Sequence, residues 1–411
     1  MFTKTLFLAE KILAILTVFL LPTQLALHFW PSYAFVFGIR VDYLSPSIYL
    51  TDILVFCLVF FWFINDRINF INFFKHYKLK IFLFVLFVFF NLFFSTFFWI
   101  SFWKWAKVIE MVLFSLYIYF RKDFVEQKNL LTSLFISAGS FSLIGISQFL
   151  LGRTTGLFYF LGERTFNSMT PGIALVEIYG RDFIRIYSTF SHPNSLAGFL
   201  GGIILLLLYT KDSLRWKRIL IILICFIAFF LTFSLSATMS LFVVILLLKT
   251  NPLKKLERKI VLTVCTLSLT LSLLLPLVSR TFYTQFNFMG KKYTERIDLA
   301  YVSGSMISSH FFQGVGLNNF IINLPKHNGV FTYQWILQPV HNSFLLIFSE
   351  TGFIGLAVYF LSFLKLLRTK YFLIFLFILI TGMVDHYWLT LQQNLLLSSF
   401  LVGLSLKRLK M

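Results

Sequence analysis

The chain has 411 residues, of which 58% are hydrophobic and 20% aromatic, including 56 phenylalanines. A soluble domain of this size does not carry so much apolar material, so the composition indicates a chain that buries its side chains in lipid. The formal net charge of +20 would suggest nucleic-acid binding in a soluble protein. In a membrane protein, however, Lys and Arg collect in cytoplasmic loops, and no nucleic-acid partner is needed to explain the charge.

Apolar segments ended by charged residues, glycine or proline predict an all-α fold, a polytopic membrane bundle of about 12 transmembrane helices. Residues 1–411 are expected to form a single membrane domain. The first span is expected to be a retained helix, because no polar, cleavable region precedes it. The three cysteines lie in apolar runs and predict no disulfide framework. The expected spans are 12–27, 49–65, 81–98, 103–120, 130–151, 193–210, 219–235, 237–249, 260–279, 341–362, 371–386 and 391–406.

The distribution of basic residues predicts the orientation of the bundle. With the N-terminus inside, 24 of the 36 Lys and Arg fall in short cytoplasmic segments, as the positive-inside bias requires. The N- and C-termini are then cytoplasmic, and segments 28–48, 152–192 and 280–340 lie on the outer face. Cations in the two long outer segments run against this bias, so an anionic partner is expected there. Solvated charges or contacts with lipid headgroups are the alternative.

The sixth span opens with the sequence T-F-S-H-P-N-S-L-A at 189–197. Ser191 can cap a helix, and Pro193 suits its first turn. The interpretation favoured for His192 is therefore a structural residue at a helix start. Arg185 lies a few residues upstream, and Arg181 one helical turn before it.

A denser pattern follows between residues 296 and 360. Arg296 opens an amphipathic run that a G-V-G sequence breaks at 314–316. After a loop come H-N-S-F-L at 341–345 and E-T-G-F-I-G-L at 350–356. Asn and Ser are good N-cap residues, so a histidine is expected at the mouth of a membrane helix.

This pattern resembles the signature of the O-antigen ligase and O-antigen polymerase superfamily, over residues of about 185–365. Those proteins of the bacterial cytoplasmic (inner) membrane move a glycan from a polyprenyl-diphosphate carrier on the outer side. The T-F-x-H-P-N-x-L-A sequence with an upstream arginine is also found in that family. Three positions depart from its pattern: Phe311-Phe312 replace a common proline, Asn318 replaces a glycine, and Leu235 replaces an arginine.

The resemblance implies roles for individual residues. His341 is expected to be the general base for the acceptor hydroxyl, because imidazole can be neutral at working pH and a helix N-terminus disfavours imidazolium. Arg296 is expected to bind the diphosphate through its planar fork, with an ion pair to Glu295 or Asp298 as the alternative. Further substrate-binding candidates are Arg185, Arg181, Arg280, Asn342 and Glu350.

The expected reaction is direct transfer of the carrier-linked glycan to an acceptor hydroxyl, with no cofactor and no metal. The sequence has no D-x-D, H-E-x-x-H, C-x-x-C or closely spaced His pair, and no G-x-x-x-x-G-K-[ST] for nucleotide hydrolysis. The resemblance does not separate a ligase, whose acceptor is a lipid A core or similar, from a polymerase that extends another carrier-linked glycan. A non-catalytic exporter is a further alternative. Asp385 is expected to be an interfacial cap, with orientation of a neighbouring group as the alternative. Glu10, Lys104, Lys107 and Glu110 have no assigned role.

Overall fold

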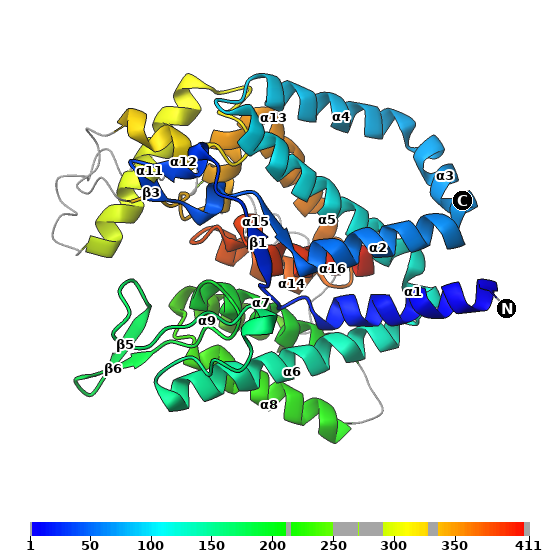
Figure 1. The fold of residues 1–411 in the computed structure, drawn as a ribbon, viewed down its shortest axis with the longest axis horizontal. Helices are drawn as coiled ribbons and strands as arrows, with labels where there is room; N and C mark the ends of the chain where they lie inside the picture. Colours follow the sequence, from blue (N-terminus) through cyan, green and yellow to red (C-terminus); the bar gives the residue numbers. More distant parts are fainter. Residues whose placement is uncertain (1, 211–214, 250–269, 271–290, 328–335, 407–411) are drawn as a thin grey trace.

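The computed structural model of the chain is mostly helical and describes residues 2–210, 215–249, 270, 291–327 and 336–406 (Figure 1). The helices are α1 (Phe2–Phe19), α2 (Leu50–Asn65), α3 (Arg67–His76), α4 (Lys78–Phe93), α5 (Phe98–Val125), α6 (Gln127–Leu151), α7 (Pro193–Tyr209), α8 (Arg215–Leu231), α9 (Leu235–Lys249), α11 (Lys291–Ser309), α12 (Phe320–Asn323), α13 (Ser343–Leu366), α14 (Phe372–Gly382), α15 (Tyr387–Thr390) and α16 (Gln392–Ser405).

The predicted span at 260–279 falls almost entirely outside the described residues, and each of the other predicted spans overlaps a described helix, with bounds that differ by up to about ten residues. Among the described helices, α6 and α13 are by themselves long and apolar enough to cross a membrane. α2 and α3 form a candidate span bent by 99°, and α7, α9 and α14 are shorter apolar helices. The chain is therefore a helical membrane protein, and the number of about twelve spans stays a prediction.

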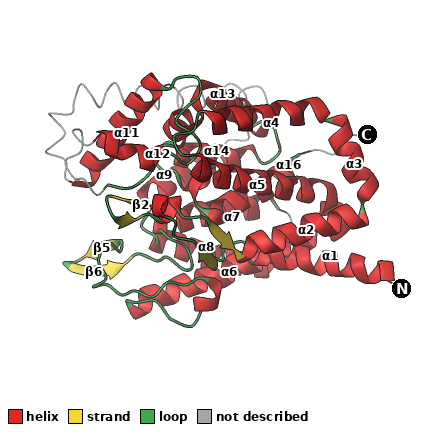
Figure 2. Ribbon diagram, turned by 45° about the horizontal axis from the view of Figure 1, so that its top comes forward, coloured by secondary structure: helices red, strands yellow, loops and turns green. Residues whose placement is uncertain are grey.

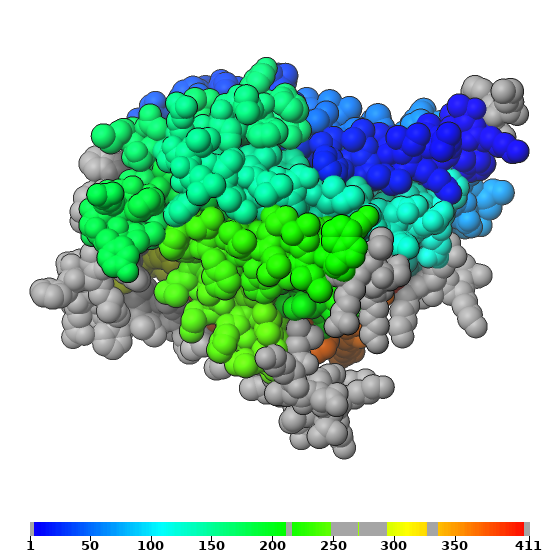
Figure 3. Space-filling view, turned by 90° about the horizontal axis from the view of Figure 1, so that it is seen from below, coloured from blue at the N-terminus to red at the C-terminus, as the bar shows by residue number. Residues whose placement is uncertain are grey.

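Helix pairs far apart in sequence build the bundle. α5 lies against α16 and α2, while α6 packs against α1 and α8. α7 runs through the centre with nearly all its side chains buried, in contact with α8 and α14. Seen from below, α1 lies beside α6, and α6, α8 and α9 make up the face (Figure 3). The N-terminus and the end of α16 lie opposite the β5–β6 hairpin (Figure 1).

Short strands form where only loops were predicted. β1 (Ala26–His28) pairs with β4 (Ser47–Tyr49), β2 (Phe35–Val36) with β3 (Ile39–Arg40), and β5 (Leu175–Ile178) with β6 (Arg181–Ile184), all antiparallel. The β2–β3 and β5–β6 pairs lie toward the end of the bundle where α11 lies, here called the loop end (Figure 2), and β1 lies nearer the middle (Figure 1). The first predicted span, 12–27, was placed too late in the chain. Helix α1 ends at Phe19 because Pro22 and the pairing of β1 prevent its continuation.

Two glycine-containing motifs form one structural unit beneath the loop end. The backbone N–H groups of Val315, Gly316 and Phe353 donate to the carbonyls of Ser349, Glu350 and Phe311, at 2.8–3.0 Å. Helix α13 is kinked to allow this, since Gly352 has φ 68° and ψ −171°. A Cβ on Gly314 would collide with the Glu350 backbone, and one on Gly352 with the Phe312 backbone. Only glycine permits this backbone approach.

Two groups of charged residues inside the helices form ion pairs. The Arg121 guanidinium donates to both carboxylate oxygens of Glu10, at 2.6 and 2.7 Å. Lys107 contacts Asp52 and lies 3.7 Å from Glu110. Burying one charge without its partner would cost several kcal/mol, so these pairs are structural. Lys104 forms no ion pair or hydrogen bond with any residue that the structure describes.

Candidate functional site

The start of α13 brings His341 to the loop end of the bundle. The Asn342 side chain caps the helix, its Oδ1 accepting from the N–H groups of Phe344 and Leu345 at 3.0 and 3.1 Å. Its Nδ2 donates to the carbonyl of Met383 at 2.9 Å, which ties this helix start to the break after α14. His341 is thereby held beside residues that follow it by more than forty positions. Asn342 itself acts here as a cap, through both ends of its amide.

His341 lies within a cluster of titratable side chains, here called the His341 cluster: His341, Asp385 and His386. His341 Nδ1 is 3.7 Å from Asp385 Oδ1, and the rings of His341 and His386 have centroids 5.1 Å apart. On its other side, His341 Nε2 is 3.2 Å from Gln338 Oε1. The cluster combines an imidazole that retains solvent exposure with a buried carboxylate, the pairing that orients a general base.

The protonation states in the cluster follow from burial and neighbouring charge. Burial lowers the pKa of His386 to about 3, although Asp385 opposes this shift, so His386 is neutral at physiological pH. Burial pulls the pKa of Asp385 upward, but the facing His341 imidazole outweighs it and holds that pKa well below its usual range. Asp385 is therefore ionised, and its carboxylate lies 3.7 Å from His341 Nδ1.

Arg185 is joined to this cluster through Asn194. Asp385 Oδ2 accepts from Asn194 Nδ2 at 3.0 Å, and Asn194 Oδ1 accepts from Arg185 Nη2 at 2.7 Å. Arg185 Nε donates to the Thr232 carbonyl at 2.6 Å, which fixes the guanidinium against the turn after α8. Arg185 is thus a positioned cation that is linked to the Asp385 carboxylate through a single residue, Asn194.

Arg181 is placed differently from Arg185. The two arginines lie on β6 and its continuation, not one helical turn apart as predicted, because residues 181–184 pair with β5. Arg181 is exposed on the hairpin, which projects from the loop end (Figure 1). The structure does not bring it to the His341 cluster. His192 is the N-cap of α7, where its Nδ1 accepts from the Asn194 N–H at 3.1 Å, consistent with the structural interpretation.

The remaining candidates are spread over three settings. Arg296 is exposed on the first turns of α11 and forms no ion pair with any described residue, Glu295 and Asp298 included. Glu350 is buried in α13, where its Oε1 accepts from the Phe320 N–H at 3.3 Å. It supports the turn at 314–316 and does not reach the His341 cluster. Arg280 lies outside the described residues.

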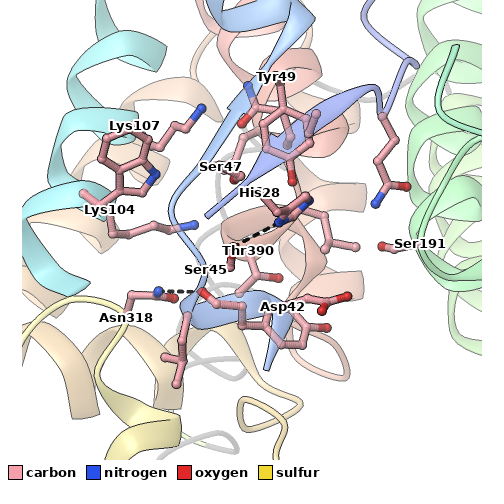
Figure 4. Close-up of a pocket in the computed structure, with 18 of the residues that line it drawn as sticks. His28, Asp42, Ser45, Ser47, Tyr49, Lys104, Lys107, Ser191, Asn318 and Thr390 are labelled. Atoms are coloured by element: carbon pink, nitrogen blue, oxygen red, sulfur yellow. Dashed lines mark hydrogen bonds between the residues drawn. The ribbon is translucent and has the colours of Figure 1, made fainter. Parts of the chain in front are cut away.

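A polar cavity of ≈ 390 Å³ has Thr390, Lys104 and Ser191 among its lining residues (Figure 4). His386 borders it, since His386 Nδ1 is 2.8 Å from Thr390 Oγ1 and its ring meets Tyr43 at 5.7 Å. Lys104 and Lys107 enter from α5 on one side, and Ser191 lies on the other (Figure 4). Arg164 also lines the cavity and donates to the Ser191 carbonyl at 2.7 Å. Lys107 is paired with Asp52, so Lys104 and Arg164 face one lining carboxylate, Asp42, and the remaining positive charge suits an anionic ligand.

Two parts of this site could not be predicted from the sequence: Asp385 as a neighbour of His341, and the cations of the cavity. Asp385 follows His341 by 44 positions, and they become neighbours through the fold, where Asn342 donates to the Met383 carbonyl and Ser343 to that of Asp385. Lys104 and Arg164 come from segments with no motif. Aromatic residues near Asp385 in the sequence favoured the prediction of a capping role. In the structure, the Asp385 side chain faces His341 and Asn194.

The His341 cluster is also the group that could hold a metal ion among the described residues. Single ligand atoms of His341, Asp385 and His386 all lie within 4.8 Å of one another. Two features reduce their capacity as ligands: His386 Nδ1 is paired with Thr390, and both Asp385 oxygens accept amide hydrogens. His341 and His386 are far apart in the sequence, so no closely spaced His pair indicated this grouping.

Comparison with known proteins identifies part of the chain. Residues 183–360 match the family model described as O-antigen ligase. The matched segment includes Arg185, Arg296, His341 and the paired glycine motifs, and it ends before Asp385. No curated protein matches the chain. The match indicates a region of the O-antigen ligase and polymerase type, a family of membrane glycan transferases.

Proposed function

From the match of residues 183–360 to the O-antigen ligase family, we propose that this protein transfers a polyprenyl-diphosphate-linked glycan to an acceptor hydroxyl. The observation that supports this most is His341 beside Asp385, in a cluster whose third member, His386, contacts Thr390 in the wall of a cavity lined by cations. A base, a carboxylate that orients it and fixed positive charge are what such a transfer needs.

The reaction proposed is a single displacement. His341 takes the proton of the acceptor hydroxyl as its oxygen attacks the anomeric carbon of the glycan. The bond from that carbon to the phosphate oxygen breaks, and the polyprenyl diphosphate leaves with the bonding electrons. Asp385 stabilises the imidazolium formed on His341, from 3.7 Å. No covalent glycosyl-enzyme intermediate is required.

Arginines stabilise the negative charge that develops on the leaving group. Their guanidinium groups bind phosphate oxygens in pairs and stay protonated. Arg185 is held through Nε and Nη2, so its charge is positioned before substrate binds. Arg296 is exposed and unpaired among the described residues, and we assign it to the diphosphate as well. Arg181 and Arg280 stay weaker candidates, and Glu350 acts through the glycine unit.

We propose that the reaction needs no divalent metal. A metal would serve to neutralise the departing diphosphate, and the cavity cations can do so instead. Asp385 and His386 already use their ligand atoms within the protein. The acidic and histidine side chains of the cluster then act in proton transfer and not as metal ligands.

The reaction is assigned to the outer face of the bacterial cytoplasmic membrane. About twelve spans with both termini in the cytoplasm would place segments 152–192 and 280–340 outside. The loop end, which carries the His341 cluster, lies opposite the N-terminus and the end of α16, in agreement with this topology (Figure 1). The chain would act as one membrane domain, with residues of about 185–365 as its ligase-like region.

The acceptor decides between a ligase and a polymerase. Purified protein is given the carrier-linked glycan alone, or with a lipid A core acceptor added. A ligase forms product only with the core acceptor, whereas a polymerase lengthens the carrier-linked glycan by itself. If neither product forms but vesicles export the lipid-linked glycan, the protein is an exporter and the transferase proposal is wrong.

A further inference from the structure

An apolar groove adjoins the polar cavity. This groove has a volume of ≈ 450 Å³ and is lined by α4, α5, α13, α14 and α16. The two spaces share five lining residues, so a cation-lined chamber and an apolar groove meet there. The residues that line both parts are Lys104, Lys107, Asn318, Thr390 and Leu395.

The groove follows helix α13. Its lining residues on this helix run from Leu346 and Thr351 through Val358 and Ser362 to Leu366. They lie on both sides of the kink at Gly352, so the groove extends along most of α13. A space of this length and volume suits one apolar chain and not the several acyl chains of a glycolipid acceptor.

The junction carries a cation without a close partner. Lys107 is neutralised by Asp52 and Glu110. Lys104 attracts Glu350 electrostatically, but it forms no hydrogen bond or ion pair with a described residue, and its ammonium points into the cavity (Figure 4). A cation held at membrane depth is stabilised by an anionic ligand. The ligand that fits both parts is an amphiphile with one apolar chain and a phosphate head.

We propose that the groove holds the polyprenyl chain of the donor lipid and that Lys104 binds its diphosphate at the junction. This assignment rests on the proposed function, and it locates the carrier. Thr390 lies at the junction and is 2.8 Å from His386, so a diphosphate there is next to the His341 cluster. Lys104 and most of the groove precede or follow residues 183–360, so the carrier site extends beyond the matched segment.

The test measures binding without any transfer. Full-length protein in phosphatidylcholine nanodiscs is titrated with a polyprenyl diphosphate that carries no glycan. Val358→Trp fills the groove, and Leu361→Trp is the matched control, because both side chains are exposed on α13 (52% and 58%) but only Val358 lines the groove. Lys104→Gln removes the junction charge and leaves the groove open, and Lys104→Arg restores the charge.

Val358→Trp and Lys104→Gln are each expected to weaken binding about tenfold or more, while Leu361→Trp and Lys104→Arg bind within about threefold of wild type. Binding by a folded Val358→Trp protein at wild-type strength would overturn the proposal. Equal displacement of the probe by phosphatidylglycerol would also overturn it, because the groove would then be an ordinary phospholipid site. A wild-type protein that binds in this way but transfers no glycan would refute the proposed function alone.

Discussion

His341 depends on its neighbours for the role proposed. The Asn342 cap fixes the backbone, and Asp385 faces the imidazole at 3.7 Å. Asp385 is in turn held by amide hydrogens from Asn194 and from its own following residue. These contacts fix the Asp385 carboxylate beside the imidazole, which a lone exposed histidine would not have.

Asp385→Asn is expected to reduce transfer by roughly a hundredfold, because the imidazole loses its orienting charge and a displacement of about 1 Å is enough for that effect. The variant can still accept from Asn194 through its amide oxygen, so the fold should persist. Initial rates of glycan transfer with purified protein measure the effect. A helix cap alone would leave the rate unchanged, and such a result would restore the interfacial role for Asp385.

Arg296→Lys is expected to lower transfer more than conservation of charge suggests, by roughly tenfold. Lysine retains the positive charge but loses the paired hydrogen-bond geometry that guanidinium offers to a phosphate. The dependence of rate on donor concentration tests this. Arg181→Lys is the matched control, since that arginine lies on the exposed hairpin. Unchanged donor saturation in Arg296→Lys would remove this residue from the diphosphate site.

At the scale of elements, apolar segments predicted the helices well, whereas the strands at the loop end were not predictable. Each strand has only two to four residues, too few for an alternating pattern to emerge. The shift of α1 has the same origin, because apolar residues continue past Pro22 into β1. His341 and the caps were read from local motifs, but their proximity to Asp385 depends on how α13 and α14 meet.

The glycine unit gives α13 a rigid connection to the turn at 314–316. Gly352→Ala is expected to destabilise the protein by about 1–3 kcal/mol or more, since φ 68° with ψ −171° is essentially a glycine conformation and a Cβ would meet the Phe312 backbone. Midpoints of thermal unfolding in detergent measure the loss. Gly139→Ala in α6 is the control, because its Cβ would meet Ile221 only at 3.9 Å. Equal midpoints for both variants would contradict the packing described here.

For the whole molecule, the proposed reaction requires the loop end to lie on the outer face of the membrane. In a cysteine-free background, a cysteine at Lys326 is expected to react with an impermeant thiol reagent added to intact cells. A cysteine at Lys78, at the start of α4, is expected to react only after the cells are opened. The physical reason is the excess of basic residues in the segments predicted to be cytoplasmic. The reverse labelling pattern would place the His341 cluster on the wrong side of the membrane.

In the proposed reaction, His341 activates the acceptor hydroxyl, and the polyprenyl diphosphate is released only when an acceptor is present. Purified protein in excess chelator is given the polyprenyl-diphosphate-linked glycan and an acceptor, and free polyprenyl diphosphate and glycosylated acceptor are both quantified. The wild type should release one carrier for each glycan transferred. A folded His341→Ala protein should be slower by about a hundredfold or more. Near wild-type transfer by His341→Ala would contradict the central claim, as would activity that chelator abolishes and a divalent metal restores.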